Sequence, residues 1–126
     1  MANELELTSI VKYNKAGIKA DLSLSTRVDI SGDKIYEGVQ SVSTSPTDPV
    51  VGSVTLAGAY IVIENLSDTM TISVENDAET AVVFCTIPPR GFAGPLQAGA
   101  GLLKLKSTIS DGTPAAANVR VIAISP

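Results

Sequence analysis

The chain of 126 residues contains no histidine, no tryptophan and only one cysteine. Without histidine, neither a Ser-His-Asp nor a Cys-His nucleophilic system can be assembled, and no imidazole is available to bind a metal. The single cysteine, Cys85, cannot form an internal disulfide. It lies between Phe84 and Thr86 in the run Ala81–Ile87, which is typical of a buried strand and offers no nearby cation, so we expect a small buried side chain and not a reactive thiol. We therefore expect a protein that is not an enzyme, with no catalytic residues, no cofactor and no metal site.

Charged residues are also scarce, at 17% of the chain, and the formal net charge is -4. The nine basic residues are spread along the chain, whereas binding to a phosphate backbone needs several of them on one face, usually beside stacking aromatic residues. The longest apolar run, from Val54 to Ile63, is about half as long as a membrane-spanning helix. The chain starts with acidic residues, Glu4 and Glu6, where a secretory signal carries basic ones. We expect no nucleic-acid partner, no membrane partner, and synthesis in the cytoplasm.

Branched side chains are abundant, because valine, isoleucine and threonine supply 35 of the residues. These residues favour strands over helices. From Ile18 to Ser31 apolar and polar side chains alternate, which predicts a strand with one apolar face and one wet face. At about 3.3 Å per residue this strand would extend roughly 40 Å. We therefore expect it to bend and to serve both layers of a sandwich, or to cross an edge.

Turn-forming residues recur about every ten positions and separate the remaining strands. We predict turns at 14–17 and 31–33, and a proline loop at 44–49 where the chain crosses between sheets. The sequence predicts one domain over residues 1–126, an all-β, antiparallel β-sandwich, jelly-roll-like, with about eight strands. Besides the long strand, the predicted strands are 4–13, 35–42, 59–65, 70–75, 81–87, 102–106 and 118–125.

Three parts of the chain carry more specific expectations. A short polar break separates 59–65 from 70–75, which predicts a β-hairpin. The segment 81–87 is apolar on both faces, so we expect it at the centre of a sheet. The segment 91–101 is rich in glycine and alanine, and we expect it to form a long irregular connection.

Acidic residues alternate in one predicted turn, at Glu75, Asp77 and Glu79. Their oxygen atoms could hold a calcium ion, although the spacing differs from that of the twelve-residue helical calcium loop. A solvated turn is the alternative, and the sequence leaves both open.

Four residues are candidates for an interface. Arg90 has a forked donor group suited to a carboxylate, and Phe92 is an aromatic residue in a predicted loop. Alternatively, Phe92 caps the end of the sandwich and Arg90 is an ordinary surface charge. Leu5 and Leu7 lie in Met1–Leu7, a short alternating segment that we expect to form an extended arm and to pair with a neighbouring chain.

Several segments share a pattern with one protein family. They are Gly58–Leu66, in which a glycine, an aromatic residue and an apolar run end in an Asn-Leu corner, then Thr71–Val74, Pro88–Gly91, Leu102–Lys106 and Val119–Ile124, with Asp29–Lys34 and Val39–Val42 in the first half. Over residues 17–126 the chain resembles the small virion structural proteins of tailed bacteriophages.

This resemblance implies a capsid decoration or cement protein, made in the bacterial host and located on the outer surface of the phage head. Its partner would be the major capsid protein, and the protein would be a homo-oligomer, with a trimer favoured. The alternative is a carbohydrate- or receptor-binding β-sandwich module of a head fibre or tail appendage. That module would need an exposed aromatic patch, which Tyr13, Tyr36 or Phe92 would have to supply.

Overall fold

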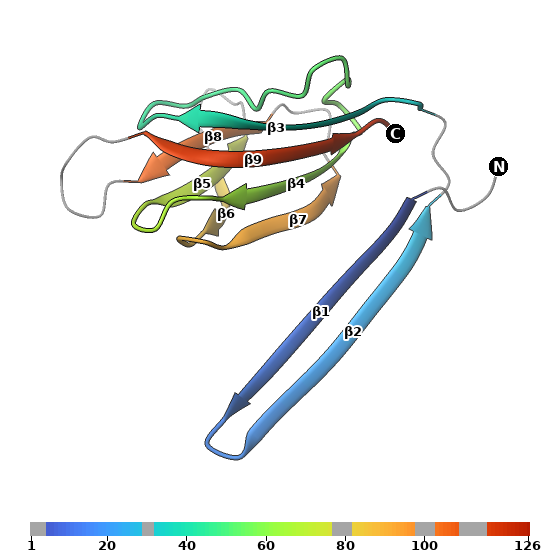
Figure 1. Ribbon diagram of the computed structural model, residues 1–126, viewed down its shortest axis with the longest axis vertical. Coiled ribbons are helices and arrows are strands. Elements are labelled where there is room, and N and C mark those ends of the chain that lie inside the picture. The colour runs from blue at the N-terminus through green and yellow to red at the C-terminus, as the bar shows by residue number, and fades with distance from the viewer. Residues whose placement is uncertain (1–4, 29–31, 77–81, 98–102, 109–115) are drawn as a thin grey trace. The chain divides into compact units, whose positions relative to one another are not determined.

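The computed structural model describes residues 5–28, 32–76, 82–97, 103–108 and 116–126, and these residues form nine β-strands (Figure 1). All strand pairs are antiparallel. Within these ranges there is no helix of the length and apolar character needed to cross a membrane. The predicted all-β, antiparallel fold is confirmed, with nine strands where about eight were expected. The chain divides into two compact units, Met1–Ser31 and Gly32–Pro126.

The first unit is a two-stranded hairpin. β1 (Leu5–Lys15) pairs with β2 (Ile18–Val28) along its whole length without a register shift. The two connecting residues, Ala16 and Gly17, both have positive φ, of 52° and 82°. Positive φ at both positions gives the turn a twist that matches the twist of the paired strands. The predicted turn at 14–17 is confirmed.

The expectation that the strand after this turn serves both layers of a sandwich is wrong. β2 pairs only with β1, in a separate two-stranded sheet. The alternation specifies an apolar face and a wet face, but it does not specify the partner strand. A two-residue turn brings the preceding strand alongside β2, so local pairing forms here.

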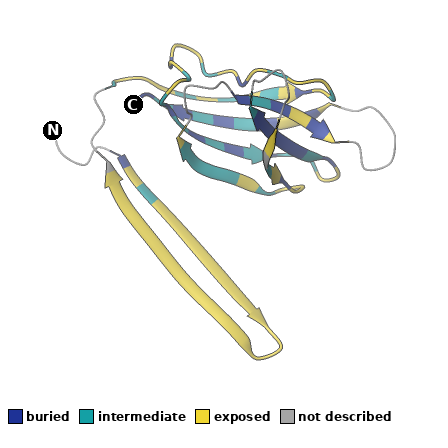
Figure 2. Ribbon diagram, turned by 180° about the vertical axis from the view of Figure 1, so that it is seen from behind, coloured by how far each residue is buried: buried dark blue, intermediate teal, exposed yellow. Residues whose placement is uncertain are grey.

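The second unit is a β-sandwich. Alternate residues of both sheets point inward and form one hydrophobic core, seen as the buried residues of Figure 2. Ile61, Ile63, Ile72 and Val74 at its centre are fully buried, and burial of each such side chain contributes about 1.5–3 kcal/mol. The four-stranded sheet has the order β3 (Ile35–Val42), β9 (Ala117–Ile124), β4 (Tyr60–Asn65), β7 (Phe92–Gln97), and the three-stranded sheet has the order β6 (Val83–Ile87), β5 (Thr71–Asn76), β8 (Leu103–Thr108).

The chain crosses between the sheets at Leu66–Met70. β4 belongs to the four-stranded sheet and β5 to the three-stranded sheet, so the predicted hairpin of 59–65 with 70–75 is wrong. The proline loop at 44–49, predicted to make the crossing, lies between β3 and β4 of the same sheet and touches the second sheet through the side chain of Asp48 and through Thr47. Its backbone exchanges two hydrogen bonds of 2.8 Å with Leu105 of β8. The chain then returns to the four-stranded sheet in β4.

Two expectations about strand position are also wrong. β6 lies at the edge of its sheet and β5 at the centre, although 81–87 was expected to be central. Phe92–Gln97, expected within an irregular connection, forms β7, the strand that was not among the eight predicted. It includes Pro95, which lacks a backbone donor. Such a residue is tolerated because β7 is an edge strand.

Candidate interaction surfaces

The register of the hairpin places apolar side chains on one of its faces. Residues directly opposite each other in an antiparallel pair lie on the same face. Val11 is opposite Leu22, Tyr13 is opposite Ala20, and Ser9 is opposite Leu24. We call this side the apolar hairpin face. Its residues are Leu5, Leu7, Ser9, Val11, Tyr13 and Lys15 of β1 with Ile18, Ala20, Leu22, Leu24 and Thr26 of β2.

The opposite side of the hairpin is polar. The single large apolar residue on it is Ile10, which is opposite Ser23. At the open end of the hairpin, Glu6 and Arg27 form an exposed ion pair at 3.4 Å. The other residues of this polar hairpin face are Thr8, Lys12, Asn14, Lys19, Asp21 and Ser25.

The apolar hairpin face is largely exposed, as Figure 2 shows for the hairpin as a whole. The exposed fraction is 58% for Leu24 and 66% for Ile18, and Val11 and Leu22 are exposed to a similar extent. An isolated two-stranded hairpin is only marginally stable in water, and a contiguous exposed apolar surface marks a site of interaction. The hairpin therefore has the features of a surface that another molecule covers.

The four-stranded sheet presents a second apolar surface. Because Ile61 and Val121 point into the core, their neighbours along β4 and β9 point outward. Ile35 and Phe92, on the two edge strands, are each 70% exposed. We call this surface the outer sheet face. Its apolar residues are Ile35 and Val39 of β3, Ile122 and Ile124 of β9, Tyr60 and Val62 of β4, and Phe92 of β7.

One ion pair lies within the outer sheet face. Nη1 of Arg120 donates to Oε2 of Glu64 at 2.9 Å, and both side chains are partly buried. These residues are opposite each other in the register of β4 and β9. Phe92 is opposite Glu64 on the other side. These two charges therefore compensate each other, while Glu37 of β3, opposite Ile122, adds an exposed carboxylate to the same face.

The outward side of the three-stranded sheet is polar by comparison. A shallow depression of about 240 Å³ lies there, lined among others by Ser73, Glu75 and Lys106. Ser73 and Thr108 hydroxyls lie 3.3 Å apart at its side. Nζ of Lys104 donates to Oδ1 of Asp48 at 2.5 Å. The two outward sheet faces of the sandwich therefore differ in character, and the four-stranded sheet carries the apolar one.

The predicted calcium turn is only partly within the described residues. Glu75 is buried in β5, opposite Lys104 in the register with β8. Asp77 and Glu79 lie outside the described residues. Among the residues that are described, no three His, Cys, Asp or Glu side chains gather as a metal site would require.

Arg90 is engaged within its own chain. Its Nε donates to Oδ1 of Asp68 at 2.5 Å, and its backbone N–H donates to the carbonyl of Ser67 at 3.1 Å. The hydrogen bond and the charge of Arg90 lower the pKa of Asp68, and the same bond and charge raise the pKa of Arg90. The residue has a φ of 60°. Both side chains are exposed, and their contact links the Leu66–Met70 crossing to the loop before β7.

The four interface candidates lie in three different places. Leu5 and Leu7 belong to the apolar hairpin face and pair with Val28 and Thr26 of the same chain, while residues 1–4 lie outside the described residues. Phe92 belongs to the outer sheet face, and Arg90 lies in the loop before it. Their role in an interface stays a prediction.

Sequence reasoning missed most of the outer sheet face. The available signal was the final strand, which is apolar at nearly every position from Val119 to Ile124. When a strand is apolar on both faces and only one face packs on the core, the other face is an apolar surface that a further layer can cover. The assignment of Ile122 and Ile124 to that face needs the register, which the sequence does not contain.

Cys85 provides a test of the sandwich in solution. The side chain is half-buried and packs against the core, and this burial raises the pKa of the thiol. We expect iodoacetamide to alkylate the folded protein more slowly at pH 8 than the protein in urea, because less thiolate is present. The pKa of the Cys85 thiol is higher in the folded protein than in the unfolded protein. Ionisation of this thiol therefore lowers the free energy of unfolding once the pH rises above the pKa of the unfolded state. Equal alkylation rates in the folded and unfolded protein would contradict the burial of Cys85.

We found no match for the chain among protein-family models, curated proteins or solved structures.

Proposed function

We propose that this protein is a capsid decoration or cement protein that attaches to the outer surface of a tailed-phage head and stabilises contacts between capsomers. The observation that carries the proposal is the outer sheet face, an exposed apolar surface with Phe92 and Ile35 at its two edges. Contiguous apolar surfaces of this kind are typical of protein contacts. The resemblance to small virion proteins supports the phage head as the partner.

The mechanism is thermodynamic. A protein that contacts two neighbouring capsomers binds the assembled shell but not separated capsomers, so it favours the shell by mass action. The protein binds the mature, expanded form of the shell selectively if the complete binding site exists only in that form. A ligand shifts an equilibrium only through a difference in its affinity for the two states. Weak contacts of several copies held in one oligomer reinforce each other through their effective concentration. The homotrimer implied by the resemblance stays a prediction.

Substitution of Phe92 by aspartate tests the outer sheet face. We expect Phe92→Asp to weaken binding to expanded shells at least about tenfold, because a charge replaces an exposed aromatic anchor at the contact. The matched control is Val50→Asp, at an exposed valine in the loop between β3 and β4. The measurement is co-sedimentation of the purified protein with shells of the phage that carries it, prepared without the protein.

The control should bind shells as the unchanged protein does. Equal binding by Phe92→Asp and the unchanged protein would exclude this face as the attachment surface. Failure of the unchanged protein to bind any shell would overturn the proposed function itself.

A carbohydrate- or receptor-binding role is the second candidate, because Phe92 is an aromatic side chain that is 70% exposed. Sugars commonly stack on exposed aromatic faces. A glycan array in which the protein binds selected sugars with sub-millimolar affinity, and loses them in Phe92→Asp, would favour this role.

A further inference from the structure

We propose that the apolar hairpin face is covered by the same face of a second copy of this chain, with the two hairpins packed face to face and antiparallel. This inference goes beyond the proposed function and does not depend on attachment to a phage head. It uses only the residues of β1 and β2.

The need for a partner follows from the chemistry of the hairpin. Two strands of 11 residues, with Val11, Leu22 and Leu24 each at least half exposed, do not form a stable structure alone in water. The polar hairpin face, with its ion pair between Glu6 and Arg27, is suited to solvent. One layer must therefore be added, and on the apolar side only.

A second copy supplies a surface of matching length and character. Each face is about 36 Å long and about 10 Å wide. Each face thus has a projected area of about 360 Å², and two such faces in contact cover roughly 700 Å² in total, the size of a weak contact. Packed antiparallel with full overlap, Tyr13 of one copy lies over Leu7 of the other, and Val11 lies over Ser9. Larger side chains thus meet smaller ones along β1.

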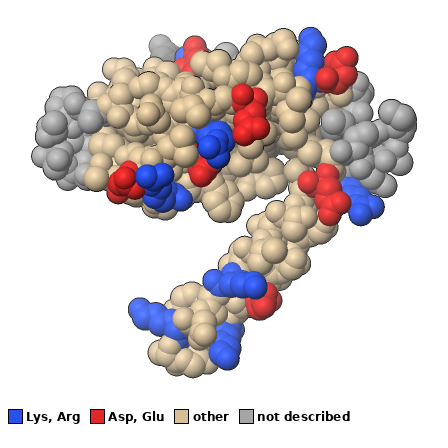
Figure 3. Space-filling view, viewed as in Figure 1, with Lys and Arg blue, Asp and Glu red and all other residues tan. Residues whose placement is uncertain are grey.

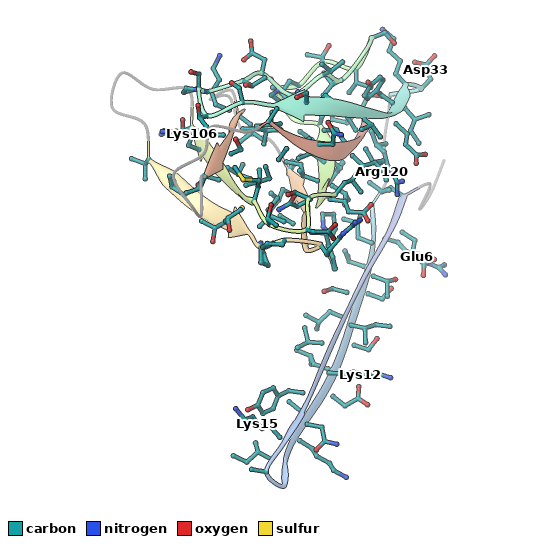
Figure 4. All side chains as sticks on the ribbon, turned by 60° about the vertical axis from the view of Figure 1, so that its left-hand side comes forward. Glu6, Lys12, Lys15, Asp33, Lys106 and Arg120 are labelled. Carbon is teal, nitrogen blue, oxygen red and sulfur yellow. The ribbon has the colours of Figure 1, made fainter. Side chains whose placement is uncertain are left out.

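Charge determines the antiparallel direction. The half of the hairpin near the turn carries Lys12, Lys15 and Lys19 against Asp21, whereas Glu6 and Arg27 cancel at the open end. Figure 3 shows the gathered basic side chains at the turn, and Figure 4 shows Lys12 and Lys15 toward the turn with Glu6 at the other end. Parallel packing would bring two basic turns together. Antiparallel packing places each basic turn over the open end of the partner, where the charges of Glu6 and Arg27 cancel among the described residues.

This pairing is compatible with the trimer that the resemblance implies. The residues of β1 and β2 belong to a different compact unit from the sandwich, so a trimer held by contacts between sandwiches uses other residues than hairpin pairing does. Pairing across oligomers would then link decoration proteins on a shell to one another.

Two substitutions test the proposal. Each replaces an exposed aliphatic side chain by lysine, one on each face of the hairpin. Leu24 on the apolar hairpin face and Ile10 on the polar hairpin face are 58% and 61% exposed. We expect the unchanged full-length protein to sediment with the mass of two or more chains. Leu24→Lys should raise the dissociation constant for this association at least about tenfold, while Ile10→Lys should change it less than about twofold. Analytical ultracentrifugation over a concentration series provides both values.

A distance measurement tests the direction of packing. A spin label at Asn14→Cys, next to the turn, is introduced in a Cys85→Ala background. With full overlap Asn14 of one copy lies over Glu6 of the other, so antiparallel pairs place the Cα atoms of the two labelled residues roughly 28 Å apart. A monomeric unchanged protein, an equal effect of Leu24→Lys and Ile10→Lys, or labels within about 20 Å of each other would each overturn the proposal. The last result would indicate a parallel bundle.

Discussion

Replacement of Asn65 by leucine is expected to lower the free energy of unfolding of the sandwich by about 3–5 kcal/mol. Asn65 is fully buried at the end of β4. Its Nδ2 donates to the carbonyls of Met70, Ile87 and Pro88 at 2.7, 3.2 and 3.1 Å, and its Oδ1 accepts from the N–H of Ser67 at 3.0 Å. Leucine leaves these backbone groups without the partner that Asn65 provides. The measurement is urea denaturation followed by far-ultraviolet circular dichroism.

Two further variants identify the cause of this loss. Asn65→Asp keeps the size of the side chain but turns a carboxylate oxygen toward three carbonyl oxygens, so it should destabilise the sandwich by at least as much at neutral pH. Asn118→Ala, at an exposed asparagine on the adjacent strand β9, should change the free energy of unfolding by less than about 0.5 kcal/mol. A loss under about 1 kcal/mol in Asn65→Leu would show that the crossing does not depend on these hydrogen bonds.

The contacts of Asn65 also explain why the hairpin predicted between 59–65 and 70–75 does not form. A short polar break between two strands is the usual mark of a hairpin. The chain instead crosses to the other sheet, because the Asn65 side chain bonds to Met70 beyond the break and to the end of β6. A tertiary contact with a strand 22 residues away decides the path, and a local pattern cannot contain it.

Strand positions were largely predictable because alternation and turn residues are local. The turn at Ala16–Gly17 and the strand that follows it were found in this way. Partner choice was less predictable: β2 joins its neighbour β1, whereas β4 joins β7 and β9. Backbone groups of any strand can pair with any other, so side-chain pattern alone does not select the sheet order.

The candidate surfaces were predictable only in part. Leu5, Leu7 and Phe92 were named from the sequence, and they belong to the apolar hairpin face and the outer sheet face. Ile35 and Val39 were expected simply as strand residues. Their exposure depends on β3 being an edge strand whose outward side is uncovered in the described part of the chain. Each surface is assembled from register across several strands, so no single segment reveals it.

Substitution of Gly94 by alanine is expected to lower the free energy of unfolding of the sandwich by about 3–5 kcal/mol. Gly94 lies in β7 with a φ of 122°, which alanine rarely adopts. A Cβ there would lie 2.6 Å from the carbonyl oxygen of Ile61 and 3.0 Å from Cα of Val62. These are backbone atoms of β4, so relief requires a shift of the paired strand. The register of β4 and β7 shifts at this point, between Ile61 and Ile63, which brings the two backbones this close.

Gly58→Ala separates the clash from the backbone strain. Gly58 also has a positive φ, of 81°, but its added Cβ would meet only the Pro126 side chain, at ordinary distances of 3.4 Å from Cγ and 3.6 Å from Cβ. We expect a loss of about 1–2 kcal/mol, because the strain of φ is present without the clash. Urea denaturation of both variants under one set of conditions provides the comparison. If Gly94→Ala is no less stable than Gly58→Ala, β4 and β7 do not approach as closely as the structure places them, and the edge that carries Phe92 is arranged differently.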